Sequence, residues 1–156
     1  MTAMSWTPAR AQGFGRPAAE PGRRPVGRVR FPENTALYTP PGWPEAVRTP
    51  HTPDWEASAT AYLLDCSPPE YRGYPVLRRH PVVLARFAAE HVESQLTACR
   101  EGLGGVRASL GEYVTPEVVE AATCAWHDQE AALRRRRREI ALVEEALRGK
   151  VFIRKL

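Results

Sequence analysis

The chain has 156 residues, with 22 basic and 18 acidic side chains and a formal net charge of +4. This length allows at most one modest domain and an additional segment. No apolar run approaches the about 18–20 residues that a bilayer-spanning helix needs, so the sequence argues against a membrane protein. Lysine occurs only at Lys150 and Lys155, and the other basic residues are arginines. This composition is typical of GC-rich coding sequences, so by itself it does not indicate nucleic-acid binding.

Residues 1–42 are rich in proline and glycine and poor in apolar side chains. Such a segment cannot bury enough surface to offset its chain entropy, so we predict a disordered N-terminal tail. Six arginines against Glu20 and Glu33 give this tail the whole net charge of +4. Residues 43–156, which we predict to be a helical domain, are therefore neutral overall.

A short helix is predicted over residues 54–66, because one apolar stripe returns at helical spacing. The stripe consists of Trp55, Ala59, Tyr62, Leu63 and Cys66. Residues 71–79 are expected to form an irregular connection. We expect the short helix to lie across the open end of the following helix pair, where Val83, Phe87 and Leu142 would provide a second apolar side.

Two long helices are predicted over residues 81–112 and 116–148, with a turn at 112–115. Proline at the first helical position starts each helix, and Gly149 ends the second. The first helix has a seam of Ala85, Ala88, Val92, Leu96, Cys99, Leu103, Val106, Leu110 and Tyr113. The second has a seam of Ala122, Trp126, Gln129, Leu133, Arg136, Ile140, Val143 and Leu147. A short turn makes the helices antiparallel. The predicted fold class is all-α: a long antiparallel helical hairpin, coiled-coil-like, with a short packed N-terminal helix and a disordered N-terminal tail.

Three glycines interrupt the apolar pattern of the first long helix at Gly102, Gly104 and Gly105. Together they cost a helix about 2–3 kcal/mol relative to alanine, which requires a compensating contact. Counting back from the turn places Trp126 opposite Leu103. We therefore expect a continuous helix in which the small residues make room for the indole, and the alternative is a real break before residue 106.

The sequence carries no pattern typical of catalysis or of metal binding. Cys66, Cys99 and Cys124 lack a C-x-x-C spacing, and the four histidines form neither H-E-x-x-H nor a facial triad. The glycines near residue 102 follow no strand, which argues against a phosphate-binding loop. We therefore expect no enzyme activity, no catalytic residues, no metal site and no cofactor. An odd number of cysteines without a disulfide framework fits a reducing cytoplasm.

The most prominent charged feature is the run from Arg134 to Arg138. One interpretation makes Arg134, Arg135, Arg137 and Arg138 a binding site for an anionic partner. The other makes the run a solvated helix surface, because five consecutive residues encircle a helix and no aromatic side chain lies nearby to stack on bases. The seam count places Arg136 opposite Val92, so we expect Arg136 or its neighbour Arg137 to pair with Glu93 or Glu90, with Arg136–Glu93 as the first choice.

Residues 55–103, including PPEYRGYPVLRRHPVVLARFAAEHVESQ at 68–95, resemble a group of uncharacterised proteins of GC-rich bacteria. The resemblance implies a bacterial, cytoplasmic setting and no known activity. The residues themselves favour a non-enzymatic helical module for protein–protein interaction or scaffolding, with an unknown protein partner. Two such hairpins can pair as a homodimer. The alternative function is a nucleic-acid-associated regulator that uses the basic tail and the arginine run.

Overall fold

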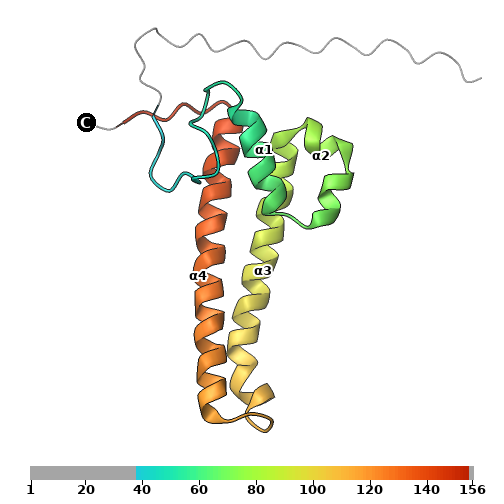
Figure 1. The fold of residues 1–156 in the computed structure, drawn as a ribbon, viewed down its shortest axis with the longest axis vertical. Helices are drawn as coiled ribbons and strands as arrows, with labels where there is room; N and C mark the ends of the chain where they lie inside the picture. Colours follow the sequence, from blue (N-terminus) through green and yellow to red (C-terminus); the bar gives the residue numbers. More distant parts are fainter. Residues whose placement is uncertain (1–37, 155–156) are drawn as a thin grey trace, which may run out of the picture. The chain divides into compact units, whose positions relative to one another are not determined.

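The computed structural model describes residues 38–154. Its helices follow in the order α1 (Trp55–Asp65), η1 (Pro69–Gly73), α2 (Pro75–Arg79), α3 (Pro81–Leu110) and α4 (Pro116–Leu147), as Figure 1 shows. η1 is a 3₁₀ helix, and no strand occurs among these residues. The predicted all-α fold with two long packed helices is confirmed. The stretch 71–79, predicted to be irregular, instead belongs largely to η1 and α2.

Prolines and a short turn define the hairpin of α3 and α4. Pro81 and Pro116 stand at the starts of the two helices, where a backbone N–H has no intrahelical partner to lose. α3 ends at Leu110 rather than at residue 112, and the chain reverses before Pro116. The two helices then run antiparallel, side by side (Figure 1).

A glycine ends α4 at the opposite end of the hairpin. Gly149 has a φ of 94°, which glycine adopts without a steric penalty. The Gly149 amide donates to the carbonyl of Ala146 at 2.9 Å, and the Lys150 amide donates to the carbonyl of Glu145 at 3.0 Å. This pair of bonds is a Schellman motif, and it satisfies two carbonyls at the end of the helix.

The core follows one apolar stripe on each long helix. On α3 the buried residues are Leu84, Ala85, Ala88, Val92, Leu96, Cys99 and Val106. On α4 they are Val119, Leu133, Ile140, Val143 and Ala146. Near the turn the prediction was wrong, because Leu110 and Tyr113 of the predicted seam are 36% and 81% exposed. Two helices alone cannot enclose large side chains at that end.

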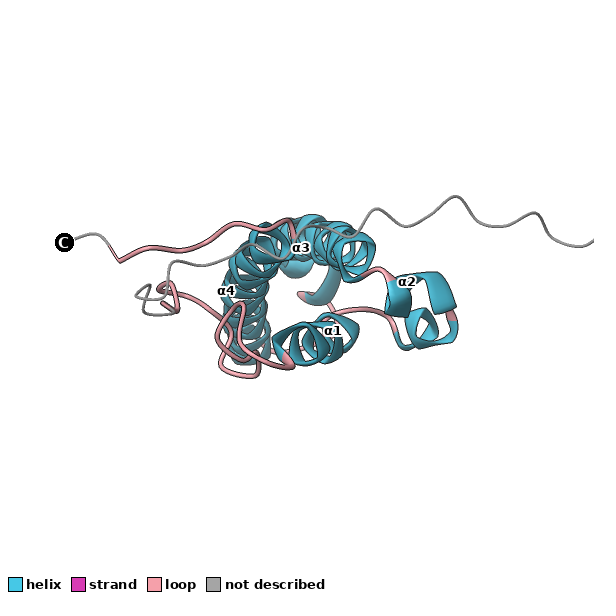
Figure 2. Ribbon diagram, turned by 90° about the horizontal axis from the view of Figure 1, so that it is seen from above, coloured by secondary structure: helices cyan, strands magenta, loops and turns pink. Residues whose placement is uncertain are grey.

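The open end of the hairpin is covered by α1 and by the segments that flank the helices. Figure 2 shows α1 beside both long helices, and Trp55, Ala59 and Leu63 are buried there. Phe152, beyond α4, returns to this end and packs edge-on against Trp43, with ring centroids 6.1 Å apart. The open end is therefore the best-filled part of the core.

One part of the predicted packing at the open end was wrong. Leu142 packs against the core as expected, but Val83 and Phe87 are 39% and 45% exposed. The buried stripe of α3 passes through Leu84 and Ala88 instead. Since neighbouring helical positions differ by about 100°, burying Leu84 and Ala88 turns Val83 and Phe87 away from α1.

The packed part of the chain begins earlier than predicted. Most of the predicted tail, residues 1–37, lies outside the described residues. Residues 38–42, also predicted to belong to the tail, contact the helical domain. Pro40 is buried and its carbonyl accepts a bond from the Trp43 amide at 3.1 Å, and the hydroxyls of Thr39 and Thr49 lie 3.1 Å apart.

The glycines of α3 behave differently from one another. The helix is continuous through Gly102, Gly104 and Gly105, as expected. A Cβ added at Gly102 would lie 2.8 Å from Cζ2 of Trp126, whereas at Gly104 or Gly105 it would meet nothing within 4 Å. The prediction that all three glycines make room for the indole is therefore correct only for Gly102.

Candidate functional site

The arginine run lies on α4, and two of its members are neutralised by carboxylates. Arg134 donates to Glu130 at 2.7 Å, and Arg100 of α3 reaches the same carboxylate oxygen at 3.2 Å. Arg137 forms an ion pair with Glu93 of α3 through its Nε. Hydrogen bonds from Arg100 and Arg134 and their positive charges lower the pKa of Glu130. Half of the proposed anion site is therefore already occupied by the protein's own acids.

The structure confirms the prediction that Arg136 or Arg137 pairs with Glu93 or Glu90, but the pair is Arg137–Glu93 and not the first choice, Arg136–Glu93. Arg137 lies against Glu93, and Arg136 is exposed on another side of α4. The inward positions of α4 run through Glu130, Leu133 and Arg137, not through the predicted Gln129 and Arg136. This register lets Arg100 and Glu93 on α3 neutralise the two charged positions.

Arg135 and Arg138, the other two predicted anion-binding residues, have no ion pair within residues 38–154. Arg138 borders a hollow of about 400 Å³ across α3 and α4, together with Glu93, Leu96, Arg100, Arg134 and Arg137. It also borders a second hollow of about 390 Å³, shared with Arg135, near Gly42. The run thus faces two different surfaces and does not form one basic face.

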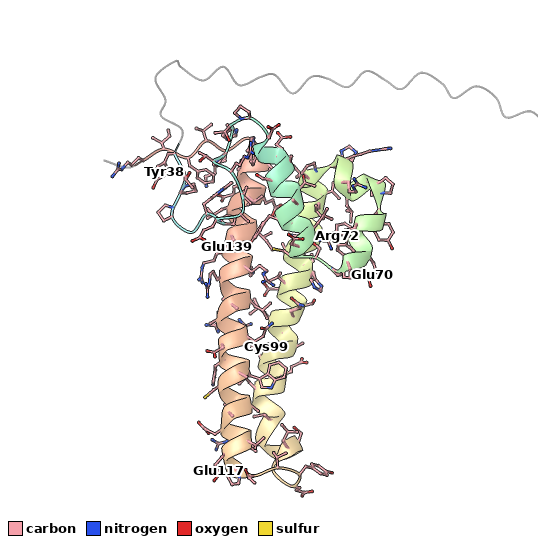
Figure 3. The ribbon with its side chains drawn as sticks, viewed as in Figure 1. Tyr38, Glu70, Arg72, Cys99, Glu117 and Glu139 are labelled. Atoms are coloured by element: carbon pink, nitrogen blue, oxygen red, sulfur yellow. The ribbon has the colours of Figure 1, made fainter. Side chains whose placement is uncertain are left out.

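Tyr62 of α1 and Cys66, the residue that caps the C-terminal end of α1, are the nearest candidates for catalysis. The Tyr62 hydroxyl donates to Oε2 of Glu139 on α4 at 2.5 Å, and Glu139 is marked in Figure 3. Burial and this hydrogen bond raise the pKa of Tyr62 well above its usual range. Burial also raises the pKa of the Cys66 thiol, although Tyr62 and Arg136 act in the other direction. The Tyr62 hydrogen bond joins α1 to α4. Both groups stay protonated at neutral pH and do not supply a nucleophile.

No group of three or more histidine, cysteine or carboxylate side chains within residues 38–154 is arranged to hold a metal ion. None of the helices in this range is both long enough and apolar enough to cross a membrane.

The most distinctive surface is the one that sequence reasoning missed. It lies on η1 and α2, here called the lobe (residues 69–79), and on the adjoining first turns of α3. Among residues 38–154, nine large hydrophobic side chains are exposed, and five of them lie between residues 74 and 87. These five are Tyr74, Val76, Val82, Val83 and Phe87. Figures 1 and 2 agree that the lobe lies beside α3 and away from α4.

Aromatic rings form the centre of this surface. Tyr71 packs edge-on against Phe87 with centroids 5.6 Å apart, and Tyr74 packs edge-on against Tyr71 at 6.3 Å. Tyr71, Tyr74 and Phe87 are called the aromatic patch below. Leu77 of α2 is 2% exposed and anchors the lobe to the core, so the patch rests on a fixed base.

Arginines form a pocket on the lobe. Arg72, Gly73, Pro75, Arg78 and Arg79 line a volume of about 490 Å³, called the arginine pocket below. Arg72, marked in Figure 3, binds Asp65 at 2.5 Å. Arg78 and Arg79 have no ion pair within the described residues, and no carboxylate lines the pocket. The alternation of tyrosine, arginine and proline in PEYRGYPVLRR is the sequence signal that could have identified this site.

The chain matches no protein-family model, no curated protein and no solved structure. The resemblance to proteins of GC-rich bacteria therefore stays a prediction from the sequence.

Proposed function

We propose that this chain is a non-enzymatic helical module for protein–protein interaction, and that its partner binds on the lobe and the adjoining turns of α3. The observation that carries the proposal is the concentration of exposed apolar side chains there. Tyr74, Val76 and Phe87 are 54%, 53% and 45% exposed within one stretch of the chain. Contiguous exposed apolar surface is a mark of interaction sites.

The composition of this surface supports the same proposal. Tyrosine, phenylalanine and arginine are enriched in the parts of interfaces that contribute most binding energy. The aromatic patch supplies two tyrosines and a phenylalanine, and the arginine pocket adjoins it on the same lobe. Because Leu77 is buried and the patch rings pack on one another, little side-chain freedom is lost when a partner binds.

A cytoplasmic setting is part of the proposal. All three cysteines are free thiols: Cys66 and Cys99 are buried and Cys124 is exposed. An exposed free thiol suits a reducing compartment, where it is not driven into disulfides.

Site-specific photo-crosslinking in the native host tests the proposal. A photoreactive residue at Val76 is expected to yield discrete crosslinked proteins, because Val76 lies within the proposed interface. The same residue at Tyr113, which is 81% exposed at the far end of the hairpin, serves as the control. An absence of crosslinks at Val76, or an identical set of products at Tyr113, would contradict the proposal.

A nucleic-acid-associated function is a second candidate, favoured by one observation. Arg100, Arg134, Arg137 and Arg138 border a single hollow across α3 and α4. Phosphate binding there would release counterions, so affinity for generic RNA or DNA would fall steeply as salt rises. A gel-shift salt series on the full chain and on Arg138→Gln tests this, and salt-insensitive or unaltered binding would reject it.

A further inference from the structure

We propose that the arginine pocket of the lobe binds an acidic segment of the partner protein, with carboxylates on Arg78 and Arg79 and apolar side chains on the neighbouring aromatic patch. This inference rests on the proposed interaction function and specifies the chemistry of the partner. It assigns separate roles to the two parts of the surface: the pocket selects charge, and the patch supplies apolar contact area.

The positive charges of the arginine pocket are only partly neutralised by the chain's own carboxylates. Asp65 neutralises Arg72 at 2.5 Å, whereas Arg78 and Arg79 are exposed and make no ion pair within residues 38–154. Glu70, the acid of η1, is not among the residues that line the pocket. Arg78 and Arg79 therefore line a hollow that no carboxylate lines, although acids and arginines are paired between α3 and α4. Planar guanidinium groups match carboxylates with two parallel hydrogen bonds.

The size and surroundings of the pocket favour a peptide segment over a free ion. A volume of about 490 Å³ lies within the range of roughly 300–1,000 Å³ found for ligand pockets, which exceeds what one small anion fills. Exposed Tyr74 and Val76 flank residues of the pocket in sequence, so a segment that places acids on Arg78 and Arg79 also meets apolar surface.

Two other occupants fit less well. The chain's own N-terminal region, residues 1–42, carries a net charge of +4 and would be repelled by the pocket. Nucleic acid carries a phosphate at every nucleotide and is bound by cations spread along a track. On the lobe the two unpaired arginines are adjacent, and the next surface is apolar, which suits a protein segment better.

Peptide-display selection on the full chain provides an unbiased test. A random peptide library is selected in parallel on the unmodified chain, on Arg78→Gln/Arg79→Gln and on the control Arg135→Gln/Arg138→Gln. The control removes the same charge from exposed arginines of α4. We expect aspartate and glutamate to be enriched on the unmodified chain and on the control, and this enrichment to be lost on the lobe variant. Enriched peptides should bind the lobe variant about tenfold more weakly or worse, since charge-assisted hydrogen bonds are lost.

The outcomes of this selection distinguish rejection of the acidic partner from rejection of the proposed interaction function. If the selected peptides are apolar without acidic residues, and lose binding to Tyr74→Ser/Val76→Ser, the acidic partner is rejected and the interaction function stands. If the selected peptides bind Tyr74→Ser/Val76→Ser and Arg78→Gln/Arg79→Gln as tightly as they bind the unmodified chain, both proposals fail. An equal loss on the α4 control indicates general charge attraction and overturns the inference. Binding of RNA or anionic vesicles that depends on Arg78 and Arg79, without acidic peptides, also overturns it.

Discussion

The contact between Gly102 and Trp126 gives opposite expectations for two neighbouring glycines of α3. Glycine inside a helix costs about 1 kcal/mol relative to alanine, so Gly104→Ala, which meets nothing within 4 Å, should stabilise the fold by about that amount. At Gly102 the new Cβ would lie 2.8 Å from the indole. Overpacking of this kind costs about 1–3 kcal/mol and cancels or exceeds the helical gain. Gly102→Ala should therefore be less stable than Gly104→Ala by about 1–3 kcal/mol.

Urea unfolding monitored by circular dichroism measures this difference, with both variants compared under identical conditions. The cause can be checked in a Trp126→Leu background. There the steric conflict is removed, so Gly102→Ala should stabilise as much as Gly104→Ala does. If Gly102→Ala is already as favourable as Gly104→Ala in the unmodified chain, the indole does not rest on this glycine. The account of the close approach between α3 and α4 would then be wrong.

Two further predictions concern the contacts that join the helices. Tyr62 has a raised pKa in the folded state, so the stability it contributes is present at neutral pH and is lost as pH rises above the usual phenol value of about 10. The urea midpoint of the unmodified chain should fall more steeply in this alkaline range than that of Tyr62→Phe, and equal slopes would contradict the prediction. A double-mutant cycle on Glu93 and Arg137 should give a coupling of about 0–1 kcal/mol, because the side chains are 46% and 57% exposed. The same cycle on Glu93 and Arg136 should give no coupling energy. A larger coupling for Arg136 than for Arg137 would support the register predicted from the sequence, in which Arg136 lies opposite α3.

Much of the hairpin was predictable because its signals are local. Proline at 81 and 116 and glycine at 149 define helix ends through backbone geometry alone, and the structure uses each of them. Repeating apolar side chains then identify one face of each helix. These signals act within a few residues of the position they determine, so they predict helix ends and helix faces without knowledge of the partner helix.

The seam of α4 was predicted incorrectly between Trp126 and Leu133, because a non-local contact decides it. Gln129 or Glu130 can each occupy the next inward position at helical spacing. The structure places Glu130 there, where Arg100 of α3 reaches it at 3.2 Å. This register brings Arg137 to Glu93 about two helical turns later along α4. The sequence of α4 alone does not contain the information about those two α3 residues.

The lobe was missed for a related reason. Prolines at 69, 75 and 81 break the helical period, so no stripe longer than one turn is visible in that stretch. Its conformation depends on the burial of Leu77 of α2 in the core and on the packing of Tyr71 of η1 against Phe87 of α3. Periodicity detects long elements, whereas short ones are stabilised by tertiary contacts that only the structure shows.

The distribution of apolar surface links this fold to the proposed interaction. At the open end of the hairpin the chain covers its own apolar stripes with α1, with Trp43 and with Phe152. On the opposite side of α3, Val83 and Phe87 stay 39% and 45% exposed, although Tyr71 of η1 packs edge-on against Phe87. Leaving such side chains in water forgoes about 25 cal/mol for each Å² of apolar area that a contact would bury. In the proposed interaction, a partner that covers this side of α3 would recover that free energy, and the unpaired Arg78 and Arg79 would favour a partner segment with negative charge.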